Sequence, residues 1–557
     1  MTRWRLVLQT LKGYWRAQVA VGLAAAVGTA VLVGALAVGD SMRASLRQAM
    51  DYRLGSTQFA MVAPERYFSE ALAARLEGFL SAATAPVLYA RGLVRSDDGS
   101  KRVNQVHVYG VDDRFYALCP GVDPWGEESK GMVLNRALAD RLEAEAGDSL
   151  LLRLERPEYL SREIVLVPDA DRSVGSRQTV WAIVGPEQFG RFTLEANQAI
   201  PYNVFVPLAW LQSLIDREGL ANTLLVGLGL GARAVTESEV NEAIQACWRL
   251  EDAQLELASR PRQGQLELST PRVFIDEAVS ETLRNADGLL TYFVNELRHD
   301  ERATPYSMVT ALGRGSQLEA LPTDMRDDQI VISQWLADDL QAQVGDTLQL
   351  SYYVVGERRA LTEEQEAFEV CRILPMTHRA IDPNLMPAFP GLAGVENCRD
   401  WEPGVEIDLD KLRDTDETYW DDYEGSPKAF LTLEAGQSIW ASRYGKLTAL
   451  RFDAEQVTPE TLTQRVLEGT DPAALGLFFM PVRARSETAL SQGTDFGPLF
   501  LGLSMFLIVG AVILTGLLFG FSIESRRQQT GLFLALGLGP KLVRSLFVRE
   551  GLVVALL

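Results

Sequence analysis

Residues that commonly carry catalysis are scarce in this sequence. Only three of the 557 residues are histidines, and none stands in an HExxH pattern. There is no GxSxG elbow, and no cysteine–histidine pair has the spacing of a known catalytic family. The GKLT at 445–448 resembles the end of a phosphate-binding loop, but Trp440 stands where that loop requires its first glycine. The sequence therefore predicts no catalytic residue, no bound cofactor and no nucleotide site. The three histidines, which we expect at the surface or in the core rather than as ligands, are His107, His299 and His378.

Cysteine is also rare. The four cysteines lie far apart and form no CxxC pair, which excludes a zinc ribbon. In an oxidising compartment they could form disulfides, and Cys371 with Cys398 would close the shortest loop. A domain of this size does not need disulfides, so free buried thiols are an equal alternative. The four residues are Cys119, Cys247, Cys371 and Cys398.

Two stretches lack charged residues altogether, residues 17–39 and 496–523. As α-helices, both are long enough to cross a hydrocarbon core of about 30 Å. They predict two transmembrane helices, the first with Tyr14 and Trp15 at its interfacial end. The alternative for the first is a cleaved signal peptide with its cleavage site at 35–37. The apolar run exceeds the ~7–15 residues of a signal peptide, which favours an uncleaved anchor.

Positive charge is missing from the long middle of the chain. The net charge is −21, yet residues 1–16 contain four basic residues and no acid, and residues 524–557 contain five basic residues and two acids. The middle is therefore strongly acidic, which argues against nucleic-acid binding because phosphate contacts need an excess of Lys and Arg. Short basic segments beside membrane spans face the cytoplasm. The asymmetry predicts an inner-membrane protein with a cytoplasmic N terminus and residues 40–495 outside.

Both predicted spans have polar continuations on the exterior side. Residues 40–55 continue the apolar spacing of a helix beyond the first span, and residues 484–497 precede the second. We expect the first continuation to be a helical stalk and the second to be its counterpart. Such stalks would connect the exterior domain mechanically to the membrane.

A repeated motif organises the exterior segment. Residues 132–152 align without gaps to residues 330–350, and ten of the 21 positions are identical. Each copy predicts a short apolar strand, an N-cap residue (Asn135 or Ser333), a short helix, and a Gly-Asp turn into a second strand.

Weaker pieces recur in the same order around this motif. The exterior therefore predicts two related α+β lobes, residues 40–265 and 266–495, with a linker at 259–265. A binding surface formed by the two lobes and a plain duplication with no site at the seam are equal alternatives. The recurring pieces are Arg66-x-Phe68 and Arg272-x-Phe274 before the motif, apolar strands at 180–185 and 368–374, and aromatic strands at 201–208 and 427–433.

The second lobe contains an insertion at 376–426 that is rich in proline, tryptophan and acidic residues. We expect a solvated acidic loop, or one that docks a cationic partner. Calcium binding is a weaker alternative, because the carboxylates lack the glycine and terminal glutamate of an EF-hand loop. The carboxylates concerned are Asp408, Asp410, Asp414 and Asp416.

The C-terminal stretch offers packing and docking features instead of chemistry. Gly516 and Gly520 form a GxxxG pattern in the second span, which lets another helix approach closely. The segment 524–549 contains an apolar run between basic residues, and it could lie in the membrane interface or dock into a groove on a cytoplasmic protein. A further apolar run begins at 550–557, where we expect a third span.

Residues 524–557 resemble the membrane block of FtsX-like ABC permeases, the family that contains the MacB and lipoprotein-release permeases. That block has two arginines, a Gly-Leu-Leu-x-Ala-Leu-Gly helix, a basic stretch and a glutamate at the third span. This sequence departs from it at Gln529-Thr530, where the family usually has Glu-Ile. The matching residues are Arg526, Arg527, Gly531, Leu532, Ala535, Leu536, Gly537, Arg544 and Glu550.

The resemblance implies a non-catalytic permease subunit with transmembrane helices and an exterior domain. It implies a second permease copy as partner and a separate cytoplasmic ABC ATPase, which hydrolyses ATP and drives an exterior domain that exports, extracts or remodels a substrate. In the family the short cytoplasmic helix binds the ATPase. This helix corresponds to Gly531, Leu532, Ala535, Leu536 and Gly537. Since the family has four spans, we also expect the chain to be a fragment that ends within the third.

Two other classes of protein fit parts of the sequence. A membrane-anchored receptor would use the exterior lobes to bind a ligand, but a third span beginning soon after the second counts against it. An anchored exterior enzyme lacks a recognisable nucleophile, base or metal cluster. Nothing in the lobes identifies a substrate.

Overall fold

The computed structural model describes residues 3–63, 66–119, 121, 123–126, 130–155, 173–195, 199–228, 235–355, 361–389, 391–395, 397–401, 407–492 and 496–556. The chain forms two compact units. We call Met1–Asp51 with Ala484–Leu557 the helical unit, and Tyr52–Arg483 the sheet unit. The protein is thus of mixed α+β type, and each unit is described by itself.

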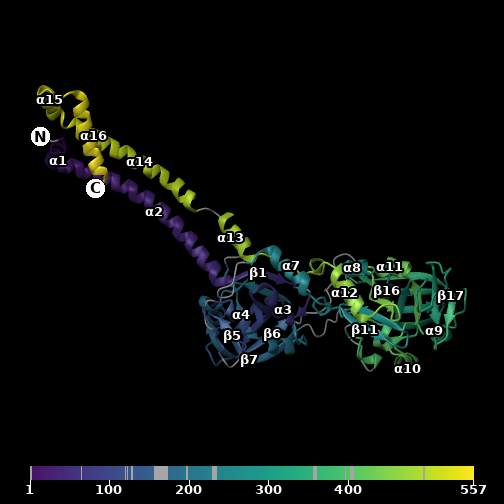
Figure 1. The fold of residues 1–557 in the computed structure, drawn as a ribbon. Coiled ribbons are helices and arrows are strands. Elements are labelled where there is room, and N and C mark those ends of the chain that lie inside the picture. Colours follow the sequence, from purple (N-terminus) through teal and green to yellow (C-terminus); the bar gives the residue numbers. More distant parts are fainter. Residues whose placement is uncertain are drawn as a thin grey trace. The chain divides into compact units, whose positions relative to one another are not determined.

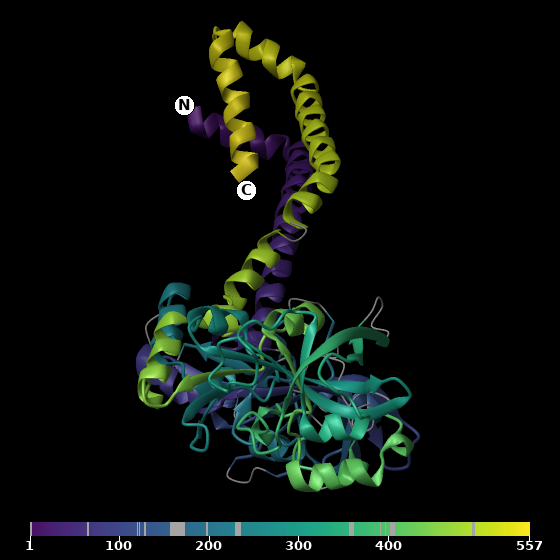
Figure 2. The same ribbon diagram turned by 90° about the vertical axis from the view of Figure 1, so that its right-hand side faces the viewer.

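The helical unit contains two long helices and several shorter ones. Figures 1 and 2 both show α14, α15 and α16 turning back as a helical hairpin, drawn in yellow. The continuous course of α2 confirms that residues 40–54 prolong the first apolar helix, and α13 is helical where a counterpart was expected. The helices are α1 (Arg3–Gly13), α2 (Trp15–Leu54), α13 (Val482–Gln492), α14 (Phe496–Glu524), α15 (Arg527–Ala535) and α16 (Pro540–Leu556).

The sheet unit is built on two sheets of eight and nine strands. The first has the order β1-β10-β3-β4-β8-β5-β7-β6, and the second has the order β11-β12-β19-β13-β14-β18-β15-β17-β16. In each, one further pairing (β3 with β6, β13 with β16) closes six strands into a barrel. The strands of the first sheet are β1 (Thr57–Val62), β3 (Ala83–Ser96), β4 (Arg102–Val111), β5 (Met132–Asn135), β6 (Ser149–Glu155), β7 (Ser173–Val184), β8 (Asn203–Pro207) and β10 (Thr223–Gly227).

The remaining elements complete the sheet unit. The strands of the second sheet are β11 (Glu256–Arg260), β12 (Gln265–Ser269), β13 (Asp287–His299), β14 (Arg302–Leu312), β15 (Gln329–Ser333), β16 (Thr347–Val355), β17 (Leu361–Leu374), β18 (Ala429–Thr432) and β19 (Ala449–Asp453). A small separate sheet pairs β2 (Phe68–Ser69) with β9 (Leu220–Ala221). The helices are α3 (Ala71–Leu80), α4 (Asp113–Ala117), α5 (Arg136–Leu142), α6 (Leu208–Leu214), α7 (Glu237–Cys247), α8 (Glu277–Thr282), α9 (Gln334–Leu340), α10 (Asp414–Tyr423), α11 (Leu433–Trp440) and α12 (Pro459–Gly469).

The strand order of the first sheet recurs in the second. Without β11, the two orders correspond strand for strand, and the directions agree as well. The pairs β4·β8 and β14·β18 are parallel, as are β5·β7 and β15·β17. Even a register shift recurs at aligned positions, between Met132 and Val133 and between Ile330 and Val331. The internal repeat therefore extends through the topology of both sheets.

The short repeated motif has the local structure that its sequence predicts. The side chain of Asn135 accepts a hydrogen bond from the amide of Leu138 at 3.1 Å, and Ser333 accepts one from Leu336 at 3.2 Å. These caps satisfy an amide that has no partner within the first helical turn. Gly147 and Gly345 have φ angles of +100° and +98°, which side chains disfavour. The strand, the capped helix, the glycine turn and the second strand are confirmed for both copies, but each helix ends before that turn, at Glu143 or Gln341 in the left-handed conformation.

The prediction of a linker at 259–265 is wrong. These residues form the end of β11, a tight turn and the start of β12, and β12 pairs with β19 inside the second sheet. Arg260 is held by Glu267 at 2.6 Å, and the buried Arg451 donates to the same carboxylate at 2.7 Å. The polar composition that indicated a linker belongs to a hairpin with a buried ionic network at its base.

The acidic insertion is not a solvated loop over its described part, which excludes residues 390, 396 and 402–406. Its apolar side chains join the core of the second barrel. Burial of the large aromatic rings is favourable, and it outweighs the preference of the neighbouring carboxylates for water. Helix α10 supplies one of these rings, Trp420. The insertion residues buried in that core include Phe389, Leu392, Cys398, Trp401, Leu412 and Trp420.

One charged network holds α10 against α9. Arg413 donates to Asp339 at 2.7 Å and to Asp416 at 2.8 Å. The buried Lys428 lies 3.6 Å from Asp416, with its ammonium 4.4 Å from the ring centre of Trp335. Burial lowers the pKa of Lys428 to about 8, although Asp416 and Asp339 favour its charged form. The insertion is therefore anchored by a specific buried contact.

A hydrophobic cluster joins the outer strands and helices of the two repeats within the sheet unit. It includes Leu72 and Val240 from the first repeat and Leu268, Val279 and Leu462 from the second. At this seam the two arginines of the recurring Arg-x-Phe pattern meet. Arg66 and Arg272 both bind the carboxylate of Asp276, at 2.5 Å and 3.0 Å.

Candidate functional site

The short helix α15 lies between the two longer helices α14 and α16. Of the five predicted coupling residues, Gly531, Leu532 and Ala535 belong to α15, while Leu536 and Gly537 follow directly. The helix ends there because Gly537 adopts a φ of +85°, and the amide of Leu538 then bonds to the carbonyl of Phe533 at 3.1 Å. The five residues thus form one compact segment.

This segment exposes three leucines. Leu532 is 58% exposed, Leu534 45% and Leu536 70%, and Gly531, Ala535 and Gly537 are exposed beside them. Phe533 lines a pocket against α1 and α16. By helical spacing Leu534 lies about 160° around the helix from Leu532 and Leu536, whereas those two lie on one side of it, and we call Leu532 and Leu536 the leucine face. Large apolar side chains on so short a helix leave apolar area unburied, so this face fits a partner or a lipid surface.

A buried ion pair closes the hairpin behind α15. Arg526 Nη1 lies 2.6 Å from Glu550 Oε2, and the two side chains are 1% and 3% exposed. Arg526 stands in the turn between α14 and α15, and its Nη2 also bonds to Ser522 Oγ at 3.2 Å. A buried charge is stable only when it is paired and hydrogen-bonded, so this pair fixes the turn relative to α16.

The N-terminal helices join the same ion pair. The Thr10 hydroxyl on α1 hydrogen-bonds to Glu550, and Gln18 Nε2 on α2 reaches the other carboxylate oxygen at 3.5 Å. The guanidinium of Arg526 lies 4.3 Å from the ring centre of Tyr14, the residue between α1 and α2. Three separate segments of the chain therefore meet at one ionic contact.

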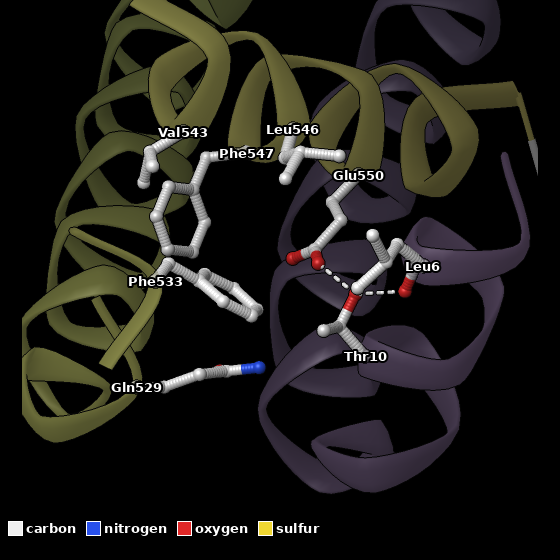
Figure 3. A pocket seen from close by; sticks show the side chains of 8 residues that line it. All are labelled: Leu6, Thr10, Gln529, Phe533, Val543, Leu546, Phe547 and Glu550. Carbon is white, nitrogen blue, oxygen red and sulfur yellow. Dashed lines mark hydrogen bonds between the residues drawn. The ribbon is translucent and has the colours of Figure 1, made fainter. Parts of the chain in front are cut away.

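A small pocket opens beside this contact. Figure 3 shows Phe533 and Gln529 on α15 and Glu550 on α16 directed toward α1, where Thr10 lies. The lining is mostly apolar, with the Thr10 hydroxyl and the Glu550 carboxylate at one side. The eight lining residues are Leu6, Thr10, Gln529, Phe533, Val543, Leu546, Phe547 and Glu550.

The predicted packing glycines Gly516 and Gly520 lie on an open face of α14. A Cβ at either position would meet no atom within 4 Å. The contact with α2 is made elsewhere, where a Cβ on Gly28 would lie 3.1 Å from Ala511. At 100° per residue, Gly516 and Gly520 point away from Ala511. The GxxxG pattern therefore does not pack α14 against α2.

Among the residues that the structure describes, two helices are long and apolar enough to cross a membrane. They are Trp15–Leu54 and Ser504–Glu524, with mean hydropathy of 2.3 and 2.5 over their most apolar windows. Only 17% and 6% of those windows is buried, whereas the core helix of a soluble domain would be mostly covered. The described part of α16 is shorter, and it continues without a break through residue 550.

The histidines and cysteines make contacts within the fold. The ring of His107 lies 3.0 Å from the Tyr89 hydroxyl, and burial lowers the pKa of His107. His299 faces the carbonyl of Thr347, and His378 accepts the amide of Ala380. All four cysteines are free thiols in this structure, and burial raises the pKa of Cys247 to about 11.

Three of the four carboxylates considered for calcium are engaged in other contacts. Asp416 is bound by Arg413, Asp414 lies 3.4 Å from Arg399, and Asp408 accepts the amide of Asp410. Among the residues that the structure describes, no group of three or more His, Cys, Asp or Glu is placed to hold a metal ion.

The ionic contact is what sequence reasoning missed. Arg526 and Glu550 were matched to the family block one by one, but their pairing and the roles of Thr10, Tyr14 and Gln18 were not foreseen. A signal was present, since an ionisable residue at the edge of an apolar helix needs a partner. Which residue provides it depends on how the helices fold back.

Comparisons with known proteins give distant similarity only. No protein-family model matches the sequence, and no curated protein sequence matches it. The periplasmic region of MacB from Actinobacillus actinomycetemcomitans is similar at 11% identity, over 35% of this chain and 85% of that one, with a TM-score of 0.23. The extracellular domain of the noncanonic ABC-type transporter YknZ from Gram-positive bacteria is similar at 8% identity, over 34% and 88%, with a TM-score of 0.21. Similarity at this level does not indicate function.

Proposed function

We propose that this chain is the permease subunit of an ABC transporter of the FtsX-like type. In this proposal a cytoplasmic ATPase binds the leucine face of α15 and drives motion in the residues outside the membrane. The observation that carries it is the exposure of Leu532 and Leu536 on one side of α15, while Phe533 of the same helix lines a pocket against α1 and α16. The resemblance of residues 524–557 to the family block supports the same assignment.

The leucine face suits a protein groove better than water. Burying one leucine contributes roughly 1.5–3 kcal/mol, so Leu532 and Leu536 together provide the core of a docking site. Arg526 is paired with the buried Glu550 and does not reach a partner protein. The exposed Arg527 and Lys541 flank the leucine face and can meet acidic residues on the rim of a groove. A short amphipathic helix inserted into a groove is a recurring mode of recognition.

The proposal assigns a topology. Residues 1–16 and 524–549 are cytoplasmic, 17–39 and 496–523 cross the inner membrane, and residues 40–495 lie outside it. The charge distribution supports this orientation, since both short basic segments then face inward. The start of a third span at 550–557 belongs to the same proposal.

The proposal also assigns partners. ATP is hydrolysed on the separate ATPase subunit, and this chain has no catalytic role or cofactor. A second permease copy, identical or related, packs on the open face of α14 at Gly516 and Gly520, where a close helix approach is sterically free. The cargo is exported, extracted or remodelled by residues 40–495, and its chemistry is not assigned.

A reconstitution with the cognate ABC ATPase tests the proposal. The chain in lipid nanodiscs is expected to bind the ATPase and change its turnover. The double variant Leu532→Asp/Leu536→Asp is expected to weaken binding about 100-fold or more, because it places two charges in an apolar groove.

The matched control is Gln528→Asp, which adds a negative charge to an exposed, already polar position of the same helix. It is expected to bind within about threefold of the unmodified chain. If the leucine variant binds as tightly as the control, α15 is not the docking helix and the assignment is wrong.

A further inference from the structure

We propose that the Arg526–Glu550 pair is the joint that carries a displacement of α15 to α2. This inference rests on the proposed function, because it takes α15 as the element that the ATPase moves. It assigns positioning roles to Arg526, Glu550, Tyr14 and Gln18, which do not touch the ATPase themselves.

The first argument is the position of the pair in the chain. Arg526 stands in the turn between α14 and α15, and Tyr14 stands in the turn between α1 and α2. The two turns lie against each other, with the guanidinium 4.3 Å from the ring centre. Turns between helices are where a chain can change direction at low cost. The contact therefore couples one turn to the other.

The second argument is that Glu550 bridges both sides. One carboxylate oxygen binds Arg526 at 2.6 Å and faces Gln18 Nε2 on α2 at 3.5 Å, and the other is hydrogen-bonded to Thr10 on α1. The pair is almost fully buried. If Arg526 moves with α15, separating it from Glu550 would leave two unpaired buried charges. Moving Glu550 with it, and α1 and α2 after it, costs less.

The third argument is that the contact has spare hydrogen-bonding capacity. Gln18 Oε1 and Arg526 Nε are buried and have no hydrogen-bond partner among the described residues. These two atoms leave one acceptor and one donor open to a new partner when the helices shift.

The fourth argument is the length of α2. It is one continuous helix from Trp15 to Leu54, so a shift at its first turn is carried along the whole helix. Displacement of α15 can then reach both long helices, α14 through the peptide chain and α2 through the ionic joint. The chain would need both for a concerted motion.

The neighbouring pair Arg527–Glu524 provides a matched control. It has the same chemistry one residue away, but both side chains are more than half exposed and it lies within a single turn. Glu550→Gln removes the buried charge and keeps the shape, whereas Glu524→Gln does the same at the surface. Arg526→Glu/Glu550→Arg restores a buried pair of opposite polarity.

The experiment measures amide hydrogen exchange of residues 10–30 in the full chain, in lipid nanodiscs, with and without the bound ATPase and with ATP or ADP. The unmodified chain and Glu524→Gln are expected to show a nucleotide-dependent change of about tenfold at these amides. Glu550→Gln is expected to bind the ATPase within about twofold of the unmodified chain and to lose that change. The charge-swapped double variant is expected to recover part of it.

Two outcomes contradict the joint. One is a full nucleotide-dependent change in Glu550→Gln, and the other is a double variant no better than the single ones. Exchange in residues 504–518 of α14, in the same unit as the substitutions, shows whether the helical unit of each variant is folded. The outcomes are separable from failure of the proposed function. If Leu532→Asp/Leu536→Asp still binds the ATPase, docking at α15 is wrong. If the nucleotide-dependent change in exchange is lost in Leu532→Asp/Leu536→Asp but kept in Glu550→Gln, docking at α15 is supported and the joint is contradicted.

Discussion

The two units of this chain place their large apolar side chains in opposite ways. The sheet unit covers apolar residues such as Phe205 and Phe430 completely. The helical unit leaves large apolar side chains such as Ile513 and Phe521 open, and its most fully buried residues include Arg526 and Glu550. Such an inversion is expected when the surroundings are apolar, because charges are then costly at the surface and must pair inside. The difference teaches that the units are built for different solvents.

The largest expected effect is the loss of a core ring in the sheet unit. Phe205 and Phe430 occupy corresponding places in the two sheets, on β8 and β18, and both are fully buried. Phe205→Ala and Phe430→Ala should each lower the free energy of unfolding by about 3–5 kcal/mol, since each leaves a cavity. Denaturant unfolding monitored by tryptophan fluorescence measures this. An effect below that of the exposed control Phe79→Ala would contradict the core described here.

A charged side chain placed on the open apolar surface of the helical unit should disfavour membrane insertion by nearly as much free energy as the loss of a core ring removes from folding. Ile513 is exposed near the middle of the second apolar helix. Ile513→Asp should disfavour membrane insertion by roughly 2.5–3.5 kcal/mol. Extraction of membranes at alkaline pH measures the integrated fraction.

The control is the substitution of the exposed Phe79 of the sheet unit by the same residue, aspartate. Phe79→Asp should change stability by no more than about 0.5 kcal/mol, because that surface faces water. Equal tolerance of aspartate at both positions would remove the contrast between the units.

The sheet unit also has a buried charge, and it should respond to pH. The pKa of Lys428 is about 8 when folded and returns to its ordinary value of 10.5 on unfolding. Between these values the unfolded chain binds more protons, so this residue's contribution to stability rises with pH, by about 3 kcal/mol in total. Lys428→Met should remove that rise.

The measurement is the midpoint of denaturant unfolding from pH 7.5 to 10. Lys446→Met, at an exposed lysine that pairs with Glu277, is the control and should keep the pH profile of the unmodified chain. A Lys428→Met profile parallel to that of the unmodified chain would show that the lysine is solvated.

The smallest effect should separate two glycines of the helical unit. Gly516→Ala fills open space and should stabilise its helix by up to about 1 kcal/mol, because alanine is the better helix former. Gly28→Ala brings a methyl group within 3.1 Å of Ala511, and crowding should cancel that gain. Thermal unfolding of the two variants in one detergent measures the difference. A larger gain for Gly28→Ala would contradict the packing of α2 on α14.

Local patterns in the sequence were enough to predict many elements. The apolar runs indicated α2 and α14, and the Asn135 and Ser333 caps with their glycine turns indicated both copies of the motif. These features depend on neighbours within a few residues. The strand order of the barrels was not predictable, because it depends on pairings between residues far apart, such as β4 with β8.

The predictions for two polar segments were wrong for a related physical reason. Polar composition indicated a linker at 259–265 and a solvated insertion at 376–426, but both contain charges that are buried against partners elsewhere. Arg260 and the buried Arg451 both bind Glu267, and Asp416 meets Lys428. In the candidate site, Arg526 and Glu550 were recognised as single residues, while the ionic joint required the fold of α14–α16.

The most direct test of the central claim is site-specific photo-crosslinking from the leucine face in living cells. A photoreactive side chain replaces Leu536 on the exposed face, or Ile513 on the lipid-facing surface of α14 as the control. The account predicts that the probe at 536 is covalently linked to an ABC ATPase, identified by mass spectrometry, and that the probe at 513 is not. Capture of lipid alone from position 536, or of the ATPase equally from both positions, would contradict it.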